Sequence, residues 1–276
     1  MRYNKLNGTD IKISHISLGG AAFSNIYGTF DEEQGVNLIE KSLDKGINYV
    51  ETGPWYGQGS SEQTVGKVHD ATFAPDTSVI LKETLPALER AVRDGKARYI
   101  GLADYDIELM QEIVEESDVK ISTILSYAKS TLFDNRLQNY TKYFKDKGIG
   151  IINAAATGMG LLSNKGPQNW HPASDDIKAI CRRASDYCKT KDVELARIAT
   201  WFSLNQPDID TNICGFYTVE QLLDTLDVMD KGLTEEEQNV LNEIQVRFFD
   251  KVTLHWDDVE LPAYKAEIEK LQKTPE

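Results

Sequence analysis

Short β-prone segments alternate with helical ones along most of this chain, and this alternation constrains the fold more than any other feature of the sequence. Strands separated by helices of about 10–15 residues form right-handed βαβ units with a parallel sheet. A short N-terminal hairpin is predicted first, with Asn7-Gly8 as a two-residue turn. Six strands are then predicted near residues 16, 47, 97, 121, 149 and 211. The fold class is therefore α/β.

Helices are predicted between these strands from apolar residues at helical spacing, with capping residues or acidic residues before them and glycine after several of them. The first opens at Asp31 and places Val36, Ile39 and Leu43 on one face, and Gly46 ends it. The others are expected at residues 83–94, 107–116, 137–147, 175–189, 194–204, 222–229 and 235–248.

Such a parallel sheet is either a closed barrel or an open doubly wound sheet. A doubly wound dinucleotide-binding sheet is indicated by Gly-x-Gly-x-x-Gly between a strand and a helix. The segment Gly158-Met159-Gly160 lacks the third glycine and continues into Leu161-Leu162 instead of a clear helix start. The sequence therefore favours a (β/α)₈ TIM barrel, and residues 1–276 are interpreted as one domain.

The strand count falls short of a closed barrel, which needs eight parallel strands. Thr52 to Glu83 leaves room for roughly one βα unit where two more strands with their helices are required. Phe73 and residues 79–81 could form a substitute strand, although Pro75 argues against a long one. Each buried unpaired backbone group costs about 1–3 kcal/mol. Strands are therefore expected to pair again, or a second chain to associate through an exposed strand edge.

Composition excludes several classes of partner. The net charge of −14 disfavours binding to nucleic acid or to anionic membranes, which requires clustered Lys and Arg. No segment approaches the roughly 20 apolar residues of a membrane span, and the N-terminus has no apolar signal-peptide core, so a cytoplasmic protein is expected. Cys181, Cys188 and Cys214 are odd in number and lack Cys-x-x-Cys spacing, which indicates reduced thiols and no metal site.

Candidate catalytic residues follow the second predicted strand. Glu51 and Tyr56 lie where that strand ends, and in parallel barrels the carboxyl ends of the strands carry the catalytic groups. A phenol donates a proton to a carbonyl when a neighbouring cation or hydrogen-bond donor lowers its pKa from about 10. His69 is a candidate for such a donor.

Each of these residues also has an ordinary structural interpretation. Glu51 could be a solvated strand-end carboxylate, Tyr56 a packed loop aromatic and His69 a hydrogen-bonded surface histidine. From these residues alone both interpretations stay open. The remaining histidines have no partner at ligand spacing and are assigned structural roles; they are His15, His171 and His255.

The motif around Glu51 and Tyr56 resembles the aldo-keto reductase family, and most closely its L-galactose dehydrogenase-like branch. Gly57–Lys67 resembles the family's Gly-x-x-x-Ser-Glu-x-x-x-Gly helix, and Gly95–Gly101 resembles the start of its fifth strand. The resemblance implies a barrel that reduces a carbonyl, or oxidises a sugar-type alcohol, by hydride transfer with NADPH or NADH. The expected partner is a small-molecule substrate.

The resemblance also implies roles for individual residues. Glu51 stands at the family's catalytic aspartate, Tyr56 at its tyrosine acid and His69 at its histidine. The catalytic lysine has no counterpart, which implies an internal deletion between Lys67 and Val68 that removes strand three and its helix. Tyr127 resembles the aromatic that stacks on nicotinamide. The full set of implied cofactor-binding residues is Gly20, Ala21, Tyr127, Ala155, Gly158, Gly160, Leu161, Gly215, Tyr217, Gln221 and Thr225.

Three departures from the family pattern lower the expected turnover. Glu51 is one methylene longer than aspartate, Ala103 replaces a polar residue near the nicotinamide amide, and Thr225 replaces an asparagine at adenine. With the lysine missing as well, two functions stay open. One is an oxidoreductase of impaired activity, and the other is a non-catalytic variant, in effect a pseudoenzyme, that binds a cofactor or a partner. A chain that does not fold stably is the third alternative.

Overall fold

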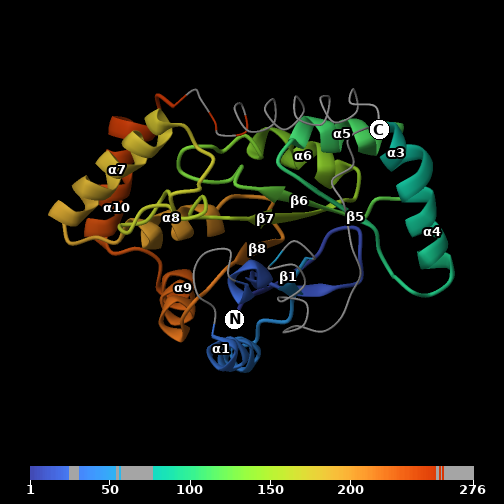
Figure 1. The fold of residues 1–276 in the computed structure, drawn as a ribbon, viewed down its shortest axis with the longest axis horizontal. Coiled ribbons are helices and arrows are strands. Elements are labelled where there is room, and N and C mark those ends of the chain that lie inside the picture. The colour runs from blue at the N-terminus through green and yellow to red at the C-terminus, as the bar shows by residue number, and fades with distance from the viewer. Residues whose placement is uncertain (25–30, 54–55, 57–76, 253–254, 256, 258–276) are drawn as a thin grey trace, which may run out of the picture.

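A six-stranded parallel sheet lies at the centre of the computed structural model, which describes residues 1–24, 31–53, 56, 77–252, 255 and 257 (Figure 1). The order of its strands across the sheet is β4-β3-β8-β7-β6-β5. These strands are β3 (Ile16–Gly19), β4 (Val50–Glu51), β5 (Gly101–Asp104), β6 (Thr123–Tyr127), β7 (Gly150–Ala154) and β8 (Thr211–Cys214).

This strand order is that of a (β/α)₈ barrel opened at one place. Strands β5 to β8 pair in sequence, and β8 then pairs in parallel with the first barrel strand, β3, through Ile16↔Asn212. In the described part of the chain β4 and β5 are the two edges, where a closed barrel would have its third and fourth strands between them. The prediction of an incomplete α/β barrel is confirmed.

Helices surround the sheet in groups (Figure 1). The helices α1 (Glu32–Asp44) and α9 (Val219–Lys231) pack side by side, and α7 (Asp175–Thr190), α8 (Leu195–Leu204) and α10 (Glu235–Ile244) form a second group. The helices α5 (Ile107–Glu116) and α6 (Gln138–Asp146) cover the half of the sheet that contains β5 and β6. The 3₁₀ helix η1 (Gly20–Phe23) follows β3, and the π-helical turn η4 (Gln245–Phe249) extends α10.

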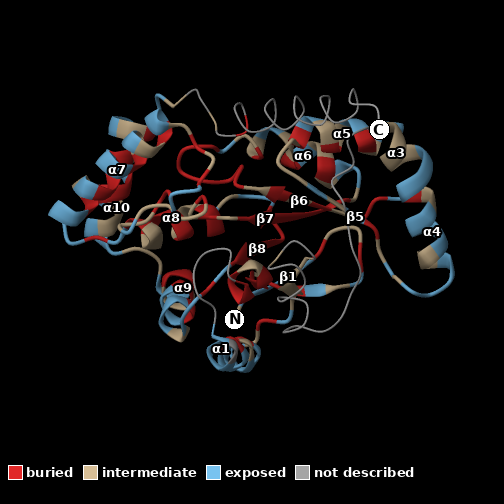
Figure 2. Cartoon of the chain, viewed as in Figure 1, coloured by how far each residue is buried: buried red, intermediate tan, exposed pale blue. Residues whose placement is uncertain are grey.

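The inner strands β3, β7 and β8 are buried on both faces, whereas the edge strands β4 and β5 are partly exposed (Figure 2). Outward side chains such as Ile124 and Ile151 pack on the helices, whereas Leu125, Ile152 and Ile213 share a separate inner cluster. Leu6 of the N-terminal hairpin belongs to this inner cluster.

The hairpin covers the amino end of the sheet. It consists of β1 (Tyr3–Lys5) and β2 (Lys12–Ser14), which pair antiparallel as predicted. Leu6 packs so closely on β7 that a Cβ at Gly150 would lie 2.7 Å from its Cδ1 atom. The amino end is therefore plugged, which leaves the opposite, carboxyl end for a binding site.

Three local predictions are wrong. Residues 79–81 are helical, within α3 (Thr77–Val79) and the π-helix η3 (Ile80–Thr84) that continue into α4 (Leu85–Arg93). Helical spacing lets Leu81 pack beside Leu85. On α1, Leu38 is buried while Val36 and Leu43 are exposed. The hairpin turn spans residues 7–10, because Leu6 N–H donates to the Ile11 carbonyl and Thr9 completes a longer loop.

Candidate active site at the carboxyl end of the sheet

Glu51 and Tyr56 form a hydrogen-bonded pair at the carboxyl end of β4. The Tyr56 hydroxyl donates to Glu51 Oε1 at 2.8 Å. A tight turn brings the two together, because the Tyr56 backbone N–H donates to the Gly53 carbonyl at 3.0 Å. Glu51 lies opposite Gly19 of β3 in the sheet register. The pair therefore stands at the end of the sheet that the hairpin leaves free.

Burial dominates the electrostatics of this pair. It raises the pKa of Glu51 above its ordinary value, and hydrogen bonds from Tyr56 and from the backbone of Gly20 offset this effect in part. Burial also raises the pKa of Tyr49, and the negative charge of Glu51 adds to that shift. Among the residues that the structure describes, Glu51 has no ion pair with a lysine or arginine. The cation expected beside this carboxylate in the family is therefore not found there.

The exits of β6 and β7 lie next to each other and carry strained backbone. Tyr127 pairs with Ala154 in the sheet, and its ring meets Tyr105 edge-on at 5.0 Å between centroids. Ala128 and Ala155, which follow the two strands, have φ angles of 60° and 61°. Non-glycine residues at positive φ are uncommon, and they gather at functional sites. Two such residues on neighbouring strands mark the carboxyl ends of β6 and β7 as a candidate binding surface.

The loop after β7 continues this surface with further positive φ angles. Met159 has a φ of 52°, and its neighbours Gly158 and Gly160 have 56° and 92°. The Gly158 N–H donates to the Ala155 carbonyl at 2.8 Å, and the Leu161 N–H donates to the Gly158 carbonyl at 3.1 Å. Leu161 itself is buried, so its side chain anchors the loop.

The exit of β8 leads through Gly215 to α9. A Cβ at Gly215 would meet only the Ala22 Cβ, at 3.9 Å, among described atoms within 4 Å, so the backbone there is open to approach. Thr218 caps α9, and the Tyr217 N–H donates to Gln221 Oε1 at 2.7 Å. Thr225 is buried in the helix.

The predicted site residues thus fall into groups. The Gly20 backbone contacts Glu51, and Ala21 follows it in η1, while the residues after β6, β7 and β8 lie at the other strand ends of the same sheet. The interior positions of Leu161 and Thr225 leave their side chains away from the surface. His69 lies outside the described residues.

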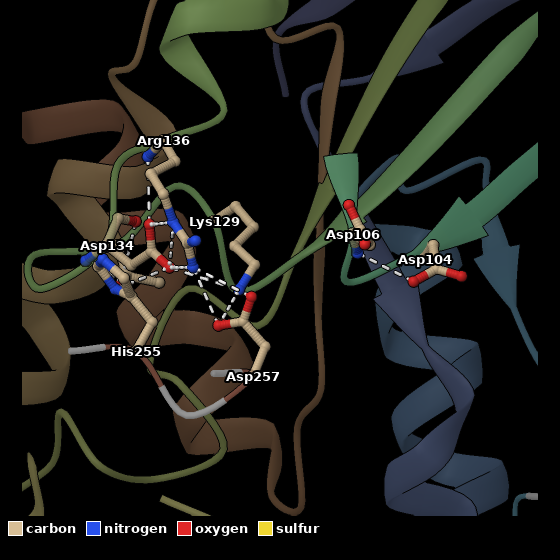
Figure 3. A network of polar contacts seen from close by, with 8 residues as sticks. Asp104, Asp106, Lys129, Asp134, Arg136, His255 and Asp257 are labelled. Atoms are coloured by element: carbon tan, nitrogen blue, oxygen red, sulfur yellow. Dashed lines mark hydrogen bonds and ion pairs between the residues drawn. The ribbon is translucent and has the colours of Figure 1, made fainter. Parts of the chain in front are cut away.

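A buried charge cluster after β6 was not anticipated from the sequence (Figure 3). Lys129, Asp134 and Arg136 from the loop after β6 meet His255 and Asp257 from the far end of the chain. His255, assigned no partner above, lies 3.1 Å from Asp134 Oδ2 through its Nδ1 atom. The clue available in the sequence is a lysine two residues after Tyr127, at a strand exit.

The residues at these strand ends are compatible with a bound dinucleotide. Phosphates bind at helix N-termini and in the loops after the seventh and eighth strands of barrels. Gly215, exposed and unobstructed, leads to the capped N-terminus of α9. The half-buried ring of Tyr127 lies at the end of β6. An extended ligand could therefore contact backbone at β8 and an aromatic ring at β6.

Fold and site together define a barrel of the TIM type with its candidate active site at the carboxyl ends of the strands. The chain belongs to the aldo/keto reductase family, because the model of that family matches residues 15–80 and 68–246. The match comes in two segments, and the second starts at Val68, beside the predicted Lys67–Val68 junction.

Curated relatives include two sugar dehydrogenases. The chain is 26% identical to L-galactose dehydrogenase of Arabidopsis thaliana over 270 residues, covering 79% of this chain and 84% of the plant protein. It is 22% identical to D-arabinose 1-dehydrogenase of Saccharomyces cerevisiae over 267 residues, covering 73% and 78%.

Solved structures share the fold. The glycerol dehydrogenase AKR11B4 of Gluconobacter oxydans superposes with a TM-score of 0.65 at 19% identity, over 89% of this chain and 95% of that one. The aldo-keto reductase AKR11C1 of Bacillus halodurans, in its holo form, gives 0.64 at 18% identity, over 88% and 96%. In the described residues, no helix is long and apolar enough to cross a membrane.

Proposed function

We propose that residues 1–276 act as a single-domain oxidoreductase that reduces a carbonyl with NADPH or NADH, or oxidises a sugar-type alcohol with the corresponding oxidised cofactor, NADP+ or NAD+. The observation that carries this proposal is the Glu51–Tyr56 pair at the carboxyl end of the sheet, 2.8 Å between oxygens. The two sugar dehydrogenases among the relatives support a polyhydroxylated substrate.

The residues of this chain divide the chemistry among them. Tyr56 gives its hydroxyl proton to the oxygen of the substrate, and Glu51 holds that hydroxyl in place. His69 orients the carbonyl, as the family resemblance implies. Tyr127 would offer its ring to a bound nicotinamide, and the loops after β7 and β8 would hold the remainder of the cofactor. A bound dihydronicotinamide would supply the hydride.

Turnover is expected to be slow. Within the described residues Glu51 lacks a cationic partner, and burial already disfavours its charged form. A lone carboxylate that accepts a hydrogen bond from a phenol disfavours the phenolate that forms when the proton is released, whereas a neighbouring lysine would stabilise that phenolate. The missing cation is therefore the main reason to expect impaired activity.

Replacement of Tyr56 by phenylalanine tests the proposal. Loss of a general acid lowers rates by about 10²–10⁴-fold, so Tyr56→Phe is expected to lower kcat at least 100-fold while the Kd for cofactor stays unchanged. Tyr140→Phe is the matched control, because the Tyr140 hydroxyl also donates to a carboxylate, Glu108, at 2.9 Å on an exposed surface. Full activity of Tyr56→Phe in steady-state assays would remove Tyr56 from the mechanism.

A second function, a non-catalytic protein that binds cofactor or a partner, is favoured by the edges of the sheet. In the described part of the chain, β4 and β5 each pair on one side only. Strand edges of this kind can pair with a second copy. This function predicts cofactor binding or dimers in light scattering without turnover. Multiple turnovers with either cofactor would exclude it.

A further inference from the structure

The ion cluster after β6 joins two distant parts of the chain. Lys129 Nζ lies 2.6 Å from Asp257 Oδ1 and 3.4 Å from Asp134 Oδ2. Arg136 Nη2 contacts the same two carboxylates, at 2.8 Å from Asp134 and 2.9 Å from Asp257. Arg136 and Asp257 are separated by 121 positions in sequence. Figure 3 shows these side chains converging on one point, which makes the cluster a link between Asp257 and the loop after β6.

This cluster is shielded from water. The side chains of Lys129, Asp134 and Asp257 are 3%, 1% and 9% exposed. Arg136, whose side chain is 37% exposed, supplies a second cation at the solvent-facing side of the cluster, and His255 adds a contact to Asp134. Removing one partner from such a set leaves a buried charge uncompensated, which is strongly destabilising. Lys129 therefore depends on Asp257 to stay where it is.

Lys129 is connected in turn to the candidate site. It follows Tyr127 by two residues, with Ala128 at a φ of 60° between them. The Ala128 N–H donates to the Ala154 carbonyl at 3.0 Å, and the Leu137 N–H donates to the Lys129 carbonyl at 3.0 Å. The loop is thus closed at both ends by hydrogen bonds. A displaced Lys129 would release the strained turn on which the position of Tyr127 depends.

We propose that Asp257 is a positioning residue. Through its ion pair with Lys129 it clasps the loop after β6 and holds Ala128 and Tyr127 in the geometry that a bound cofactor would meet. The effect on the cofactor rests on the proposed function, whereas the clasp itself does not. The clasp and its effect on cofactor binding are measured in separate experiments.

Hydrogen exchange tests the clasp directly. In Asp257→Asn, peptides that contain Ala128 and Leu137 are expected to exchange at least about tenfold faster than in the unaltered chain, because the buried Lys129 has lost a charge partner. Asp250→Asn is the matched control, since Asp250 accepts from Gln245 at 2.9 Å in an exposed position. Asp257→Glu, which keeps the charge, is expected to recover most of the protection. Unchanged exchange in Asp257→Asn would overturn the clasp.

A paired variant covers the case in which Asp257→Asn does not fold. Lys129→Met combined with Asp257→Leu removes both charges and leaves Arg136 paired with Asp134. This variant is expected to unfold cooperatively and still to exchange faster at Ala128 and Leu137. Protection equal to that of the unaltered chain would show that the ion pair does not hold the loop.

Cofactor titration then tests the positioning role. Asp257→Asn is expected to raise the Kd for NADH about tenfold, equivalent to about 1.4 kcal/mol, and Asp257→Glu to recover it. If Asp257→Asn exchanges faster but binds NADH with an unchanged Kd, Asp257 clasps the loop but does not position Tyr127 for the cofactor. If the unaltered chain binds no NADH, the proposed function fails, while the exchange experiment still decides whether the clasp exists.

Discussion

The environment of Glu51 leads to a prediction about how the stability of the protein depends on pH. Its pKa is raised above 4.5, mainly by burial. At pH values between 4.5 and the pKa of Glu51 in the folded protein, the folded state binds more protons than the unfolded state. The free energy of unfolding therefore falls as pH rises through this range. Glu51→Gln removes this titration and keeps an oxygen that can accept from Tyr56.

We therefore predict that the stability of Glu51→Gln, relative to the unaltered chain, increases as pH rises above about 4.5 and then levels off. Urea unfolding at a series of pH values measures this difference. Glu108→Gln, at the exposed carboxylate that accepts from Tyr140, is the control. A difference that does not vary with pH would show that Glu51 titrates normally.

Contacts between residues were predictable from the sequence only where the two residues lie close together along the chain. The proximity of Glu51 and Tyr56 followed from a motif in which one turn separates them, and the structure places them in contact. The partnership of Lys129 with Asp257 could not follow, because only the folded chain brings these residues together.

At the level of elements, α9 carries a prediction about the choice of cofactor. Residues 217–230 contain four acidic side chains and no lysine, arginine or histidine. The neighbouring cations are engaged: Arg197 lies 3.0 Å and Lys231 lies 2.6 Å from Asp227. A 2′-phosphate on the cofactor would meet like charge here, which disfavours binding. NADH is expected to bind at least about tenfold more tightly than NADPH.

A charge reversal on α9 checks this preference. Glu220→Arg, in the first turn of the helix, is expected to strengthen NADPH binding relative to NADH binding, so that the ratio of their dissociation constants moves toward one. Asp230→Arg makes the same change about 15 Å away along the helix and is expected to leave the ratio unaltered. Tighter binding of NADPH than of NADH by the unaltered chain would contradict the assignment.

Elements were predicted well where the pattern was unambiguous. Helix α5 has the predicted bounds, because a clear amphipathic period indicates a helix, and strand β8 begins at the predicted position. Residues 79–81 were mistaken for a strand, since a short run of β-branched and apolar residues suits either structure and packing of Leu81 beside Leu85 decides it. On α1, tertiary contacts select Leu38 over Val36.

At the scale of the whole molecule, the sequence predicted six strands, and the described structure has six in its main sheet. What it could not provide was the way the remaining elements hold an open barrel together. The hairpin plugs the amino end through Leu6, and the helices cover the outer face. β6, β7 and β8 pair in parallel, so their carboxyl ends lie side by side, which is why the proposed cofactor-binding end is expected to function.

The most direct test of this account is a titration of the purified chain with NADH and NADPH, following cofactor fluorescence and thermal unfolding together. Saturable binding, tighter for NADH, with an upward shift of a cooperative melting transition is the predicted result, because a ligand that binds only the folded state stabilises it. A cooperative melt that neither cofactor shifts would contradict the claim that the open barrel retains its cofactor-binding end.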